Sequence, residues 1–246
     1  MEEDQNKKTS FWAKSEIYLT PISIIIAGII IAGAIIFVNF ANKEKIVGKK
    51  DSTISQKNLD SNDYYQTKID ETNLQKISLE KEPSLGNSDA SLTVIEFSDF
   101  ECPFSARFHL ETFPQIKKEY IDTGKIRLIF KNFPLSFHKF AQVAAQAGKC
   151  AQEQGKFWEY ADSLFKNQEN LEVENLKKYA QDLGLDIQEF NSCLDSEKYK
   201  EEITKDYEEG LNLGVIGTPY FIIGSEGLIG AESFSEFQKI IERNFK

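Results

Sequence analysis

The distribution of apolar residues divides the chain into three parts, of which the first is a long uncharged run. Residues 17–42 contain no charged side chain, and residues 22–38 are almost entirely Ile, Ala and Gly. As a helix, the uncharged run would extend about 39 Å, enough to cross a bilayer core of about 30 Å. This pattern predicts one transmembrane helix over residues 17–42, preceded by a short polar tail over residues 1–16. A cleaved signal peptide is the alternative, but the run is longer than a typical signal core and no small-x-small cleavage site follows it.

The second part, residues 43–82, is polar. Lys, Asp, Ser, Asn and Gln dominate it, and its apolar residues are too sparse to close a core of their own. We therefore expect a polar linker that behaves as a flexible tether. The alternative is a short helix with four apolar side chains on one face, Tyr65, Ile69, Leu74 and Ile77.

The third part, residues 83–246, has the periodicities of an α/β domain. Apolar, β-favouring residues predict strands at 92–97 and 125–130, with an amphipathic helix at 104–120 between them. A connection of this length joins parallel strands, so we expect a βαβ unit whose two strands are neighbours. Pro114 lies inside the helix and predicts a kink or break there.

A long helical block follows, at about 140–213. Residues that stop or cap helices punctuate it, at Gly155, Asn167–Asn170, Gly184 and Asp195. Alternation returns at 220–223, with a short partner strand at 228–230 and a closing helix at 234–245. The predicted order is a βαβ half and a ββα half separated by an inserted helical subdomain.

Composition narrows the classes of function. The 246 residues carry a formal net charge of −10, which gives no support to nucleic-acid binding. The sequence contains no metal-ligand spacing, phosphate-binding loop or nucleophile elbow, so we expect neither a metal nor a cofactor. The three cysteines are an odd number, so at least one lies outside any intramolecular disulfide.

Cys102 lies where a reactive thiol is expected. The strand at 92–97 ends in a polar turn, Cys102 follows, and Pro103 opens the amphipathic helix. Unpaired N–H groups at a helix N-terminus stabilise an anion just outside the first turn, and proline is favoured at the first helical position. The thiolate is the reactive form of cysteine, so we predict that Cys102 is a nucleophile. The alternative is a buried free cysteine that acts as a small apolar residue.

Four other ionisable residues are candidates for a role beside Cys102, and they include the two histidines of the chain. Asp99 and Glu101 either oppose thiolate formation by charge repulsion or are solvated turn residues. His109 is about two helical turns beyond Cys102, too far for a Cys–His pair in a regular helix, so we expect a packing or surface role. His138 precedes the helical block, and we expect it beside a helix cap rather than in catalysis.

Two short motifs resemble the DsbA-like thioredoxin-fold thiol-disulfide oxidoreductases: Cys102-Pro103-Phe104-Ser105 and Gly217-Thr218-Pro219. The resemblance covers about residues 83–246 and is also carried by Phe133-Pro134-Leu135, Ala144-Ala145, Gly155-Lys156-Phe157-Trp158 and Cys193-Leu194-Asp195. It implies an α/β thioredoxin fold with an inserted helical subdomain and a cis peptide bond before Pro219. It also implies that the backbone of Thr218 pairs with a bound peptide as an added strand. The substrate contacts implied in this way are Thr218, Pro219, Pro103 and Phe104.

Ser105 departs from the family motif, Cys-Pro-x-Cys, at the second cysteine. In a Cys-x-x-Cys site the second thiol attacks the mixed disulfide and releases the substrate, which a hydroxyl cannot do. We therefore predict monothiol exchange through Cys102, with Ser105 donating a hydrogen bond to the thiolate. A non-catalytic peptide-binding or chaperone-like module is the alternative. A serine introduced to trap mixed disulfides would leave the same sequence, with an ordinary dithiol enzyme as its parent.

Cys150 and Cys193 both lie in the helical block. The resemblance implies a structural disulfide between them, which in the chain-entropy description would contribute about 4 kcal/mol to stability. Two alternatives remain open: a pair of unpaired core thiols, or one of the two acting as the resolving thiol for Cys102.

Cysteine chemistry of this kind suits an oxidising compartment. We therefore expect a single-pass protein of the cell membrane whose C-terminal domain lies outside the cytoplasm. Lysines on the two sides of the transmembrane run nearly balance, so charge does not decide the orientation, and a cytoplasm-facing thiol protein is the alternative. The expected partners are protein substrates with cysteines or disulfides, a small thiol or a membrane redox partner, and no nucleic acid.

Overall fold

The computed structural model describes residues 66–69 and 71–245, which belong to one compact unit. The predicted tail at 1–16 and the predicted transmembrane helix at 17–42 lie outside these residues. Among the helices within them, none is long and apolar enough to cross a membrane.

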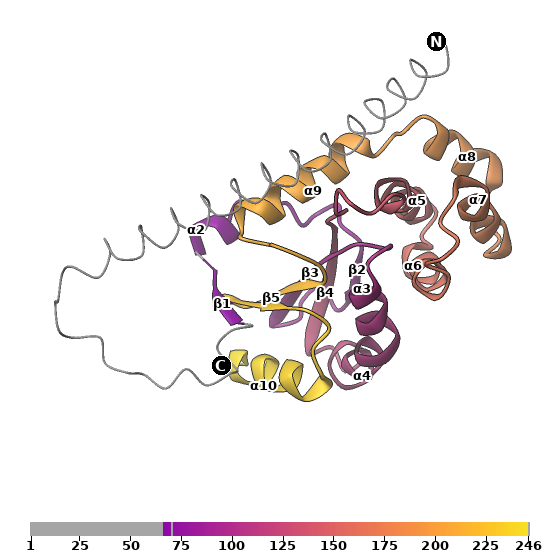
Figure 1. The fold of residues 1–246 in the computed structure, drawn as a ribbon. Coiled ribbons are helices and arrows are strands. Elements are labelled where there is room, and N and C mark those ends of the chain that lie inside the picture. Colours follow the sequence, from indigo (N-terminus) through magenta and orange to yellow (C-terminus); the bar gives the residue numbers. More distant parts are fainter. Residues whose placement is uncertain (1–65, 70, 246) are drawn as a thin grey trace, which may run out of the picture. The chain divides into compact units, whose positions relative to one another are not determined.

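Six strands of the described part form one mixed sheet, in the order β1-β6-β5-β3-β4-β2 (Figure 1). They are β1 (Gln66–Lys68), β2 (Ser84–Gly86), β3 (Leu92–Ser98), β4 (Ile126–Asn132), β5 (Tyr220–Ile223) and β6 (Glu226–Ile229). β3 and β4 are parallel, and the other pairs are antiparallel. This confirms the predicted βαβ unit at the centre of the sheet.

Helices cover both faces of the sheet. Alternate side chains of β3 point to opposite faces, so Val94 and Ile95 enter two different cores. The helix after β3 and α10 (Phe234–Asn244) cover the core around Val94. The end of α9 (Lys200–Asn212) and the segment after it cover the core around Ile95. Figure 1 shows α9 above the sheet and α10 below it.

The helix after β3 does not break at Pro114. It runs from Pro103 to Ile121 and alternates between α and π geometry, as α3 (Pro103–Arg107), η2 (Phe108–Thr112), α4 (Phe113–Ile116) and η3 (Lys117–Ile121). Just before the proline, the Phe113 N–H donates to the carbonyl of Phe108, five residues back. A wide π turn leaves space for the proline ring, which in a regular α-helix would collide with the carbonyl four residues back. Of the predicted kink or break, the break is therefore wrong, and the irregularity beside the proline is a π turn.

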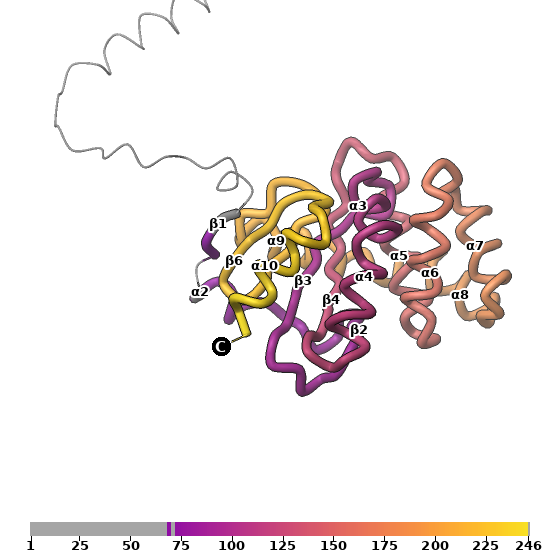
Figure 2. Tube along the Cα trace, turned by 90° about the horizontal axis from the view of Figure 1, so that it is seen from below, coloured from indigo at the N-terminus to yellow at the C-terminus, as the bar shows by residue number. Residues whose placement is uncertain are grey.

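The inserted helical subdomain is confirmed. Its first four helices are α5 (Ala141–Glu153), α6 (Phe157–Lys166), α7 (Val173–Asp182) and α8 (Ile187–Asp195). They gather beyond the β4–β2 side of the sheet, and α9 then returns to the sheet (Figures 1 and 2). The short α2 (Glu71–Leu74) precedes the sheet strands β2 to β6 in the chain.

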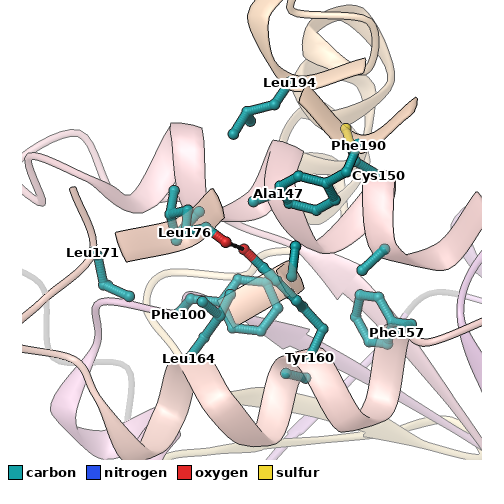
Figure 3. Packing of buried hydrophobic residues seen from close by; sticks show 14 of the residues in the cluster. Phe100, Ala147, Cys150, Phe157, Tyr160, Leu164, Leu171, Leu176, Phe190 and Leu194 are labelled. Carbon is teal, nitrogen blue, oxygen red and sulfur yellow. Dashed lines mark hydrogen bonds between the residues drawn. The ribbon is translucent and has the colours of Figure 1, made fainter. Parts of the chain in front are cut away.

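The subdomain has its own apolar core, to which the turn between β3 and α3 contributes Phe100 (Figure 3). Tyr160 is fully buried there, and its hydroxyl donates to the Leu176 carbonyl oxygen at 2.8 Å. A disulfide joins Cys150 of α5 to Cys193 of α8, with Cα atoms 5.9 Å apart. The structure thus contains the pairing that the resemblance implies, and Cys102 is the free cysteine.

Residues 66–69 and 71–82 are part of the domain. β1 extends the sheet by pairing with β6, and Ile69 is buried in the core on the α9 side. Leu74 and Ile77 pack against the same core. The linker prediction is therefore wrong for this segment, and so is the helix alternative, because α2 ends at Leu74 and Ile69 precedes it. These apolar residues are too sparse for a core of their own, but here they add to a core that the rest of the chain supplies.

A buried group of ion pairs ties this N-terminal segment to β4, α5 and α9. Lys131 Nζ lies 3.5 Å from Glu82, 3.0 Å from Asp206 and 2.6 Å from Glu209. Lys149 also contacts Glu82, at 3.1 Å. Burial and the neighbouring Asp206 raise the pKa of Glu82 to about 7, while the two lysines act in the opposite direction. The lysines are therefore what favours the charged form of this carboxyl.

Lys131→Met tests this cluster. The substitution preserves most of the side-chain length but leaves Glu82 and Asp206 without their shared cation, and removing one partner leaves the other buried and uncompensated. We expect the free energy of unfolding, measured by urea titration at pH 7, to fall by about 3 kcal/mol. Lys205→Met is the control, because Lys205 is exposed and lies 3.8 Å from Glu209; it should change stability by less than about 0.5 kcal/mol. Equal losses in the two variants would contradict the role of the cluster.

Candidate active site

Cys102 lies between the turn after β3 and helix α3. It is the N-cap residue, with extended backbone (φ −75°, ψ 121°), and Pro103 is the first helical residue. Its carbonyl oxygen accepts from the Ala106 N–H at 3.1 Å, which is the first bond of the helix. The remaining N–H groups of the first turn face the N-cap end. Cys102 is 4% exposed, so the thiol lies inside the site rather than on the open surface.

The loop before β5 faces this thiol. The Thr218–Pro219 peptide bond is cis, and Cys102 Sγ donates a hydrogen bond to the Thr218 carbonyl oxygen at 3.3 Å. The two segments meet because β3 and β5 are antiparallel neighbours, with Phe97 paired to Tyr220. The bond needs the thiol proton, so it holds the neutral thiol and is lost when the thiolate forms. The structure thus brings Cys102, Thr218 and Pro219 together.

Ser105 is one helical turn beyond Cys102 and is completely buried. Its hydroxyl oxygen has no hydrogen-bond partner in the described part of the chain. The expected hydrogen bond from Ser105 to Cys102 is therefore not formed in this state, in which the thiol is bonded to Thr218. The Thr218 hydroxyl is also buried and has no partner among the described residues.

The two acids beside Cys102 are not solvated turn residues. The buried Asp99 carboxylate accepts from the Leu135 N–H at 2.8 Å and from His138 Nδ1 at 2.8 Å. Burial raises its pKa, and these hydrogen bonds act in the opposite direction. The Glu101 carboxylate accepts from the Phe140 N–H. Both acids therefore hold the loop after β4 against residues 99–102, the active-site turn, which gives His138 a supporting role.

His109 has a packing role. Its Nε2 lies 2.5 Å from Asp162 Oδ1 of α6, and its ring contacts Phe113 and Phe165, with centroids 5.0 and 4.5 Å apart. Burial lowers the pKa of His109, while Asp162 acts in the opposite direction. In residues 66–69 and 71–245, no group of three or more His, Cys, Asp or Glu side chains is placed to hold a metal ion.

Glu96 is a buried carboxyl on the central strand, six residues before Cys102. It is paired with Phe130 of β4 on one side and with Phe221 of β5 on the other. Burial raises the pKa of Glu96 to about 8. Neither Glu96 Oε1 nor the Ser98 hydroxyl has a hydrogen-bond partner in the described part of the chain. The group is thus mostly protonated at neutral pH. Glu96 was not predicted from the sequence, although an acid inside an apolar strand is a visible signal.

Three exposed large apolar side chains belong to α3 or to segments that contact the turn before it: Phe104, exposed by 54%, Phe137 by 77% and Ile216 by 83%. Phe104 belongs to the first turn of α3, and Ile216 lies two residues before Thr218. Phe137 lies in the loop that Asp99 holds. Only Phe104 was identified from the sequence. Ile216 could have been found from its place beside the cis-proline motif, whereas Phe137 could not, because only tertiary contacts bring its loop to the site.

Known proteins share this fold. The family model described as "Thioredoxin" matches residues 78–243. A "probable disulfide bond formation protein D" of Bacillus anthracis is 32% identical over 178 residues, which cover 66% of this chain and 78% of that protein. The crystal structure of oxidised BdbD from Bacillus subtilis covers 68% of this chain and 94% of its own, with a TM-score of 0.63 and 27% identity. That of alpha-DsbA1 from Wolbachia pipientis covers 70% and 94%, with a TM-score of 0.61 and 26% identity.

The family match begins at residue 78, inside the segment that the polar composition predicted to be a linker, and ends within α10. It does not include β1 and α2, which the structure adds to the domain. It includes the Cys102 motif, the helical subdomain and the cis-proline loop. The chain therefore belongs to the thioredoxin family, among the DsbA-like thiol-disulfide oxidoreductases.

Proposed function

We propose that this protein exchanges protein disulfides through a single thiol, that of Cys102. One arrangement carries the proposal: a free cysteine at the start of α3 faces the cis-proline loop, while a serine occupies the position of the second thiol. Thiol-disulfide oxidoreductase chemistry is that of the family to which the chain belongs. The serine restricts this chemistry to steps that one thiol can perform.

The exchange takes two balanced steps. The Cys102 thiolate first attacks one sulfur of a substrate disulfide, forms a mixed disulfide and releases the other substrate sulfur as a thiolate. A second thiolate, from the substrate or from a small thiol, then attacks the mixed disulfide and restores the Cys102 thiolate. When that second sulfur belongs to the substrate, the disulfide is rearranged without net oxidation. Ser105 cannot supply it, so release depends on an external thiol or on the substrate.

The substrate class follows from the surface around the thiol. Thr218, Pro219 and Pro103 offer backbone and apolar contacts beside Cys102, and an extended peptide would pair with the backbone at Thr218. The exposed side chains of Phe104, Phe137 and Ile216 would contact apolar residues that flank the substrate cysteine. This arrangement suits an extended or unfolded segment of a protein more than a small disulfide.

The proposed location is the outer side of the cell membrane, with residues 17–42 as the anchor. The uncharged run in the sequence supports the anchor, because its length suits a bilayer core. The disulfide between Cys150 and Cys193 supports an oxidising compartment. A small thiol or a membrane redox partner would then restore Cys102.

A peptide-binding or chaperone-like module is the second candidate. The exposed apolar side chains and the missing second thiol favour it, because both are compatible with binding without turnover. The Cys102→Ala variant separates the two functions. Client association that survives this substitution, together with an unchanged phenotype, supports the binding module.

Oxidised glutathione tests the exchange proposal on the full-length protein. We expect intact-mass analysis to show one glutathione added at Cys102, at a rate at least about tenfold above that of a cysteine in an unstructured peptide at pH 7. Cys150 and Cys193 should remain unlabelled by alkylation before reduction, because they are bonded to each other.

The control is Cys102→Ala, which should acquire no glutathione under the same conditions. A wild-type thiol that reacts no faster than the peptide cysteine would remove the activated nucleophile and leave the binding module as the function. Three alkylated cysteines in protein isolated from cells would contradict the proposed oxidising location.

A further inference from the structure

Gln168 reaches the active-site turn from the helical subdomain. It lies between α6 and α7, and its side-chain Nε2 donates to two backbone carbonyl oxygens, that of Phe100 at 2.8 Å and that of Cys102 at 2.9 Å. An amide group has two N–H donors, so both bonds form together. They join residues that are 68 and 66 positions apart in the chain.

We propose that Gln168 is a positioning residue, which holds Cys102 in the orientation in which the N-terminus of α3 stabilises its thiolate. The proposal rests on the proposed function, since it assumes that Cys102 reacts as a thiolate. The two anchored carbonyls lie on either side of Glu101, so together they restrain the backbone that leads into the N-cap. In this state the Cys102 side chain forms no hydrogen bond with the first-turn N–H groups, because its sulfur is bonded to the Thr218 carbonyl. Rotation of that backbone would move the sulfur relative to the helix N-terminus, whose field favours the thiolate.

The amide also acts on the charges around the sulfur. A carbonyl oxygen is the negative end of a dipole, and near a thiolate it raises the energy of the anion. The Cys102 carbonyl already accepts from the Ala106 N–H, and Gln168 is a second donor to it. Through these bonds Gln168 favours the thiolate without touching the sulfur.

Other contacts place the end of α6 against the turn before α3 and against η2, the segment after α3. Phe165, in the last turn of α6, packs on Phe100 and on His109, with ring centroids 5.0 and 4.5 Å apart. Asp162 of the same helix is bonded to His109. The end of α6 is therefore held in place by packing, so Gln168 in the turn after it can restrain Cys102.

The test measures how the alkylation rate of Cys102 in the full-length protein depends on pH. With Cys150 and Cys193 bonded, alkylation reports Cys102 alone. In Gln168→Met, which keeps the side-chain length and loses both donors, we expect the rate at pH 6 to fall about three- to tenfold, with an unchanged limiting rate at high pH. Gln168→Lys restores donors and adds a positive charge, so its profile should move to lower pH.

Asn170→Ala is the matched control, because it removes an exposed amide from the same turn and should reproduce the wild-type profile. A role in folding alone would change the melting temperature of the Gln168 variants and leave the pH profiles superimposed on wild type, which overturns the proposal. If Gln168→Met does not fold, the profile of Gln168→Lys decides. A Gln168→Lys profile that does not move to lower pH then overturns the proposal. If the alkylation rate of Cys102 in the wild-type protein depends on pH as that of a cysteine in an unstructured peptide does, the proposed function is rejected, and not only the role of Gln168.

Discussion

Ser105→Cys is expected to convert a protein that needs an external thiol to resolve its mixed disulfide into one that closes its own disulfide. Cα atoms three residues apart in the first turn of a helix are about 5 Å apart, within the range that a disulfide spans. The buried Ser105 hydroxyl has no partner in the described part of the chain, so Ser105→Cys removes no hydrogen bond there. The new thiol would attack the mixed disulfide intramolecularly, which we expect to speed release by roughly 10³-fold or more over millimolar glutathione.

The measurement compares products after exposure to oxidised glutathione. The wild-type protein should keep one glutathione on Cys102, whereas Ser105→Cys should lose it and lose two hydrogens as its internal disulfide forms. It should also oxidise a two-cysteine peptide that the wild-type protein leaves reduced. Ser88→Cys is the control, since it adds a thiol in the exposed turn before β3, at the other end of that strand from Cys102. A stable glutathione adduct on Ser105→Cys would contradict the position assigned to Cys102.

The stability of the protein is expected to fall with rising pH because of Glu96. Its ordinary pKa of 4.5 applies in the unfolded chain, and burial raises the pKa to about 8 in the folded protein. Between these values the folded protein keeps a proton that the unfolded chain has released, so the free energy of unfolding decreases by about 1.4 kcal/mol per pH unit. Over the whole window the loss is roughly 5 kcal/mol.

Glu96→Gln should remove this dependence. The buried amide adds an offset that does not change with pH, so the comparison is between slopes and not between absolute stabilities. We expect the difference in unfolding free energy between variant and wild type to increase steadily from pH 4.5 to pH 8 in urea titrations, to roughly 5 kcal/mol. Glu208→Gln, at an exposed position, should leave the slope unchanged. Parallel curves for Glu96→Gln and wild type would show that Glu96 is ionised in the folded state.

The order of helices and strands was predictable because it depends on local periodicity. Tyr220–Ile223 was predicted with the bounds that the structure has, and the parallel pairing of β3 with β4 followed from the length of the connection between them. The predicted break at Pro114 was wrong because a π turn accommodates the proline. Periodicity does not distinguish α from π geometry over so few residues.

The candidate site was predictable only in part. Cys102 could be identified because its neighbours in the sequence, Pro103 above all, create the helix terminus that favours a thiolate. The supporting roles of Asp99 and Glu101 were missed, since their partners lie more than thirty residues away in the chain. Ser105 was expected to bond to the thiol, but the thiol is bonded to the Thr218 carbonyl.

The sequence by itself determined the α/β order, the inserted helices and the single thiol at the start of a helix, because each depends on residues that are adjacent or regularly spaced. Only the tertiary structure decided that the segment from β1 to Glu82 joins the domain and that Lys131 links this segment to α9. The tertiary structure also decided that the Gln168 side chain is bonded to the active-site turn. Each of these features depends on which distant segments come into contact. The sequence around a polar residue is the same whether its side chain is solvated or bonded to a buried partner.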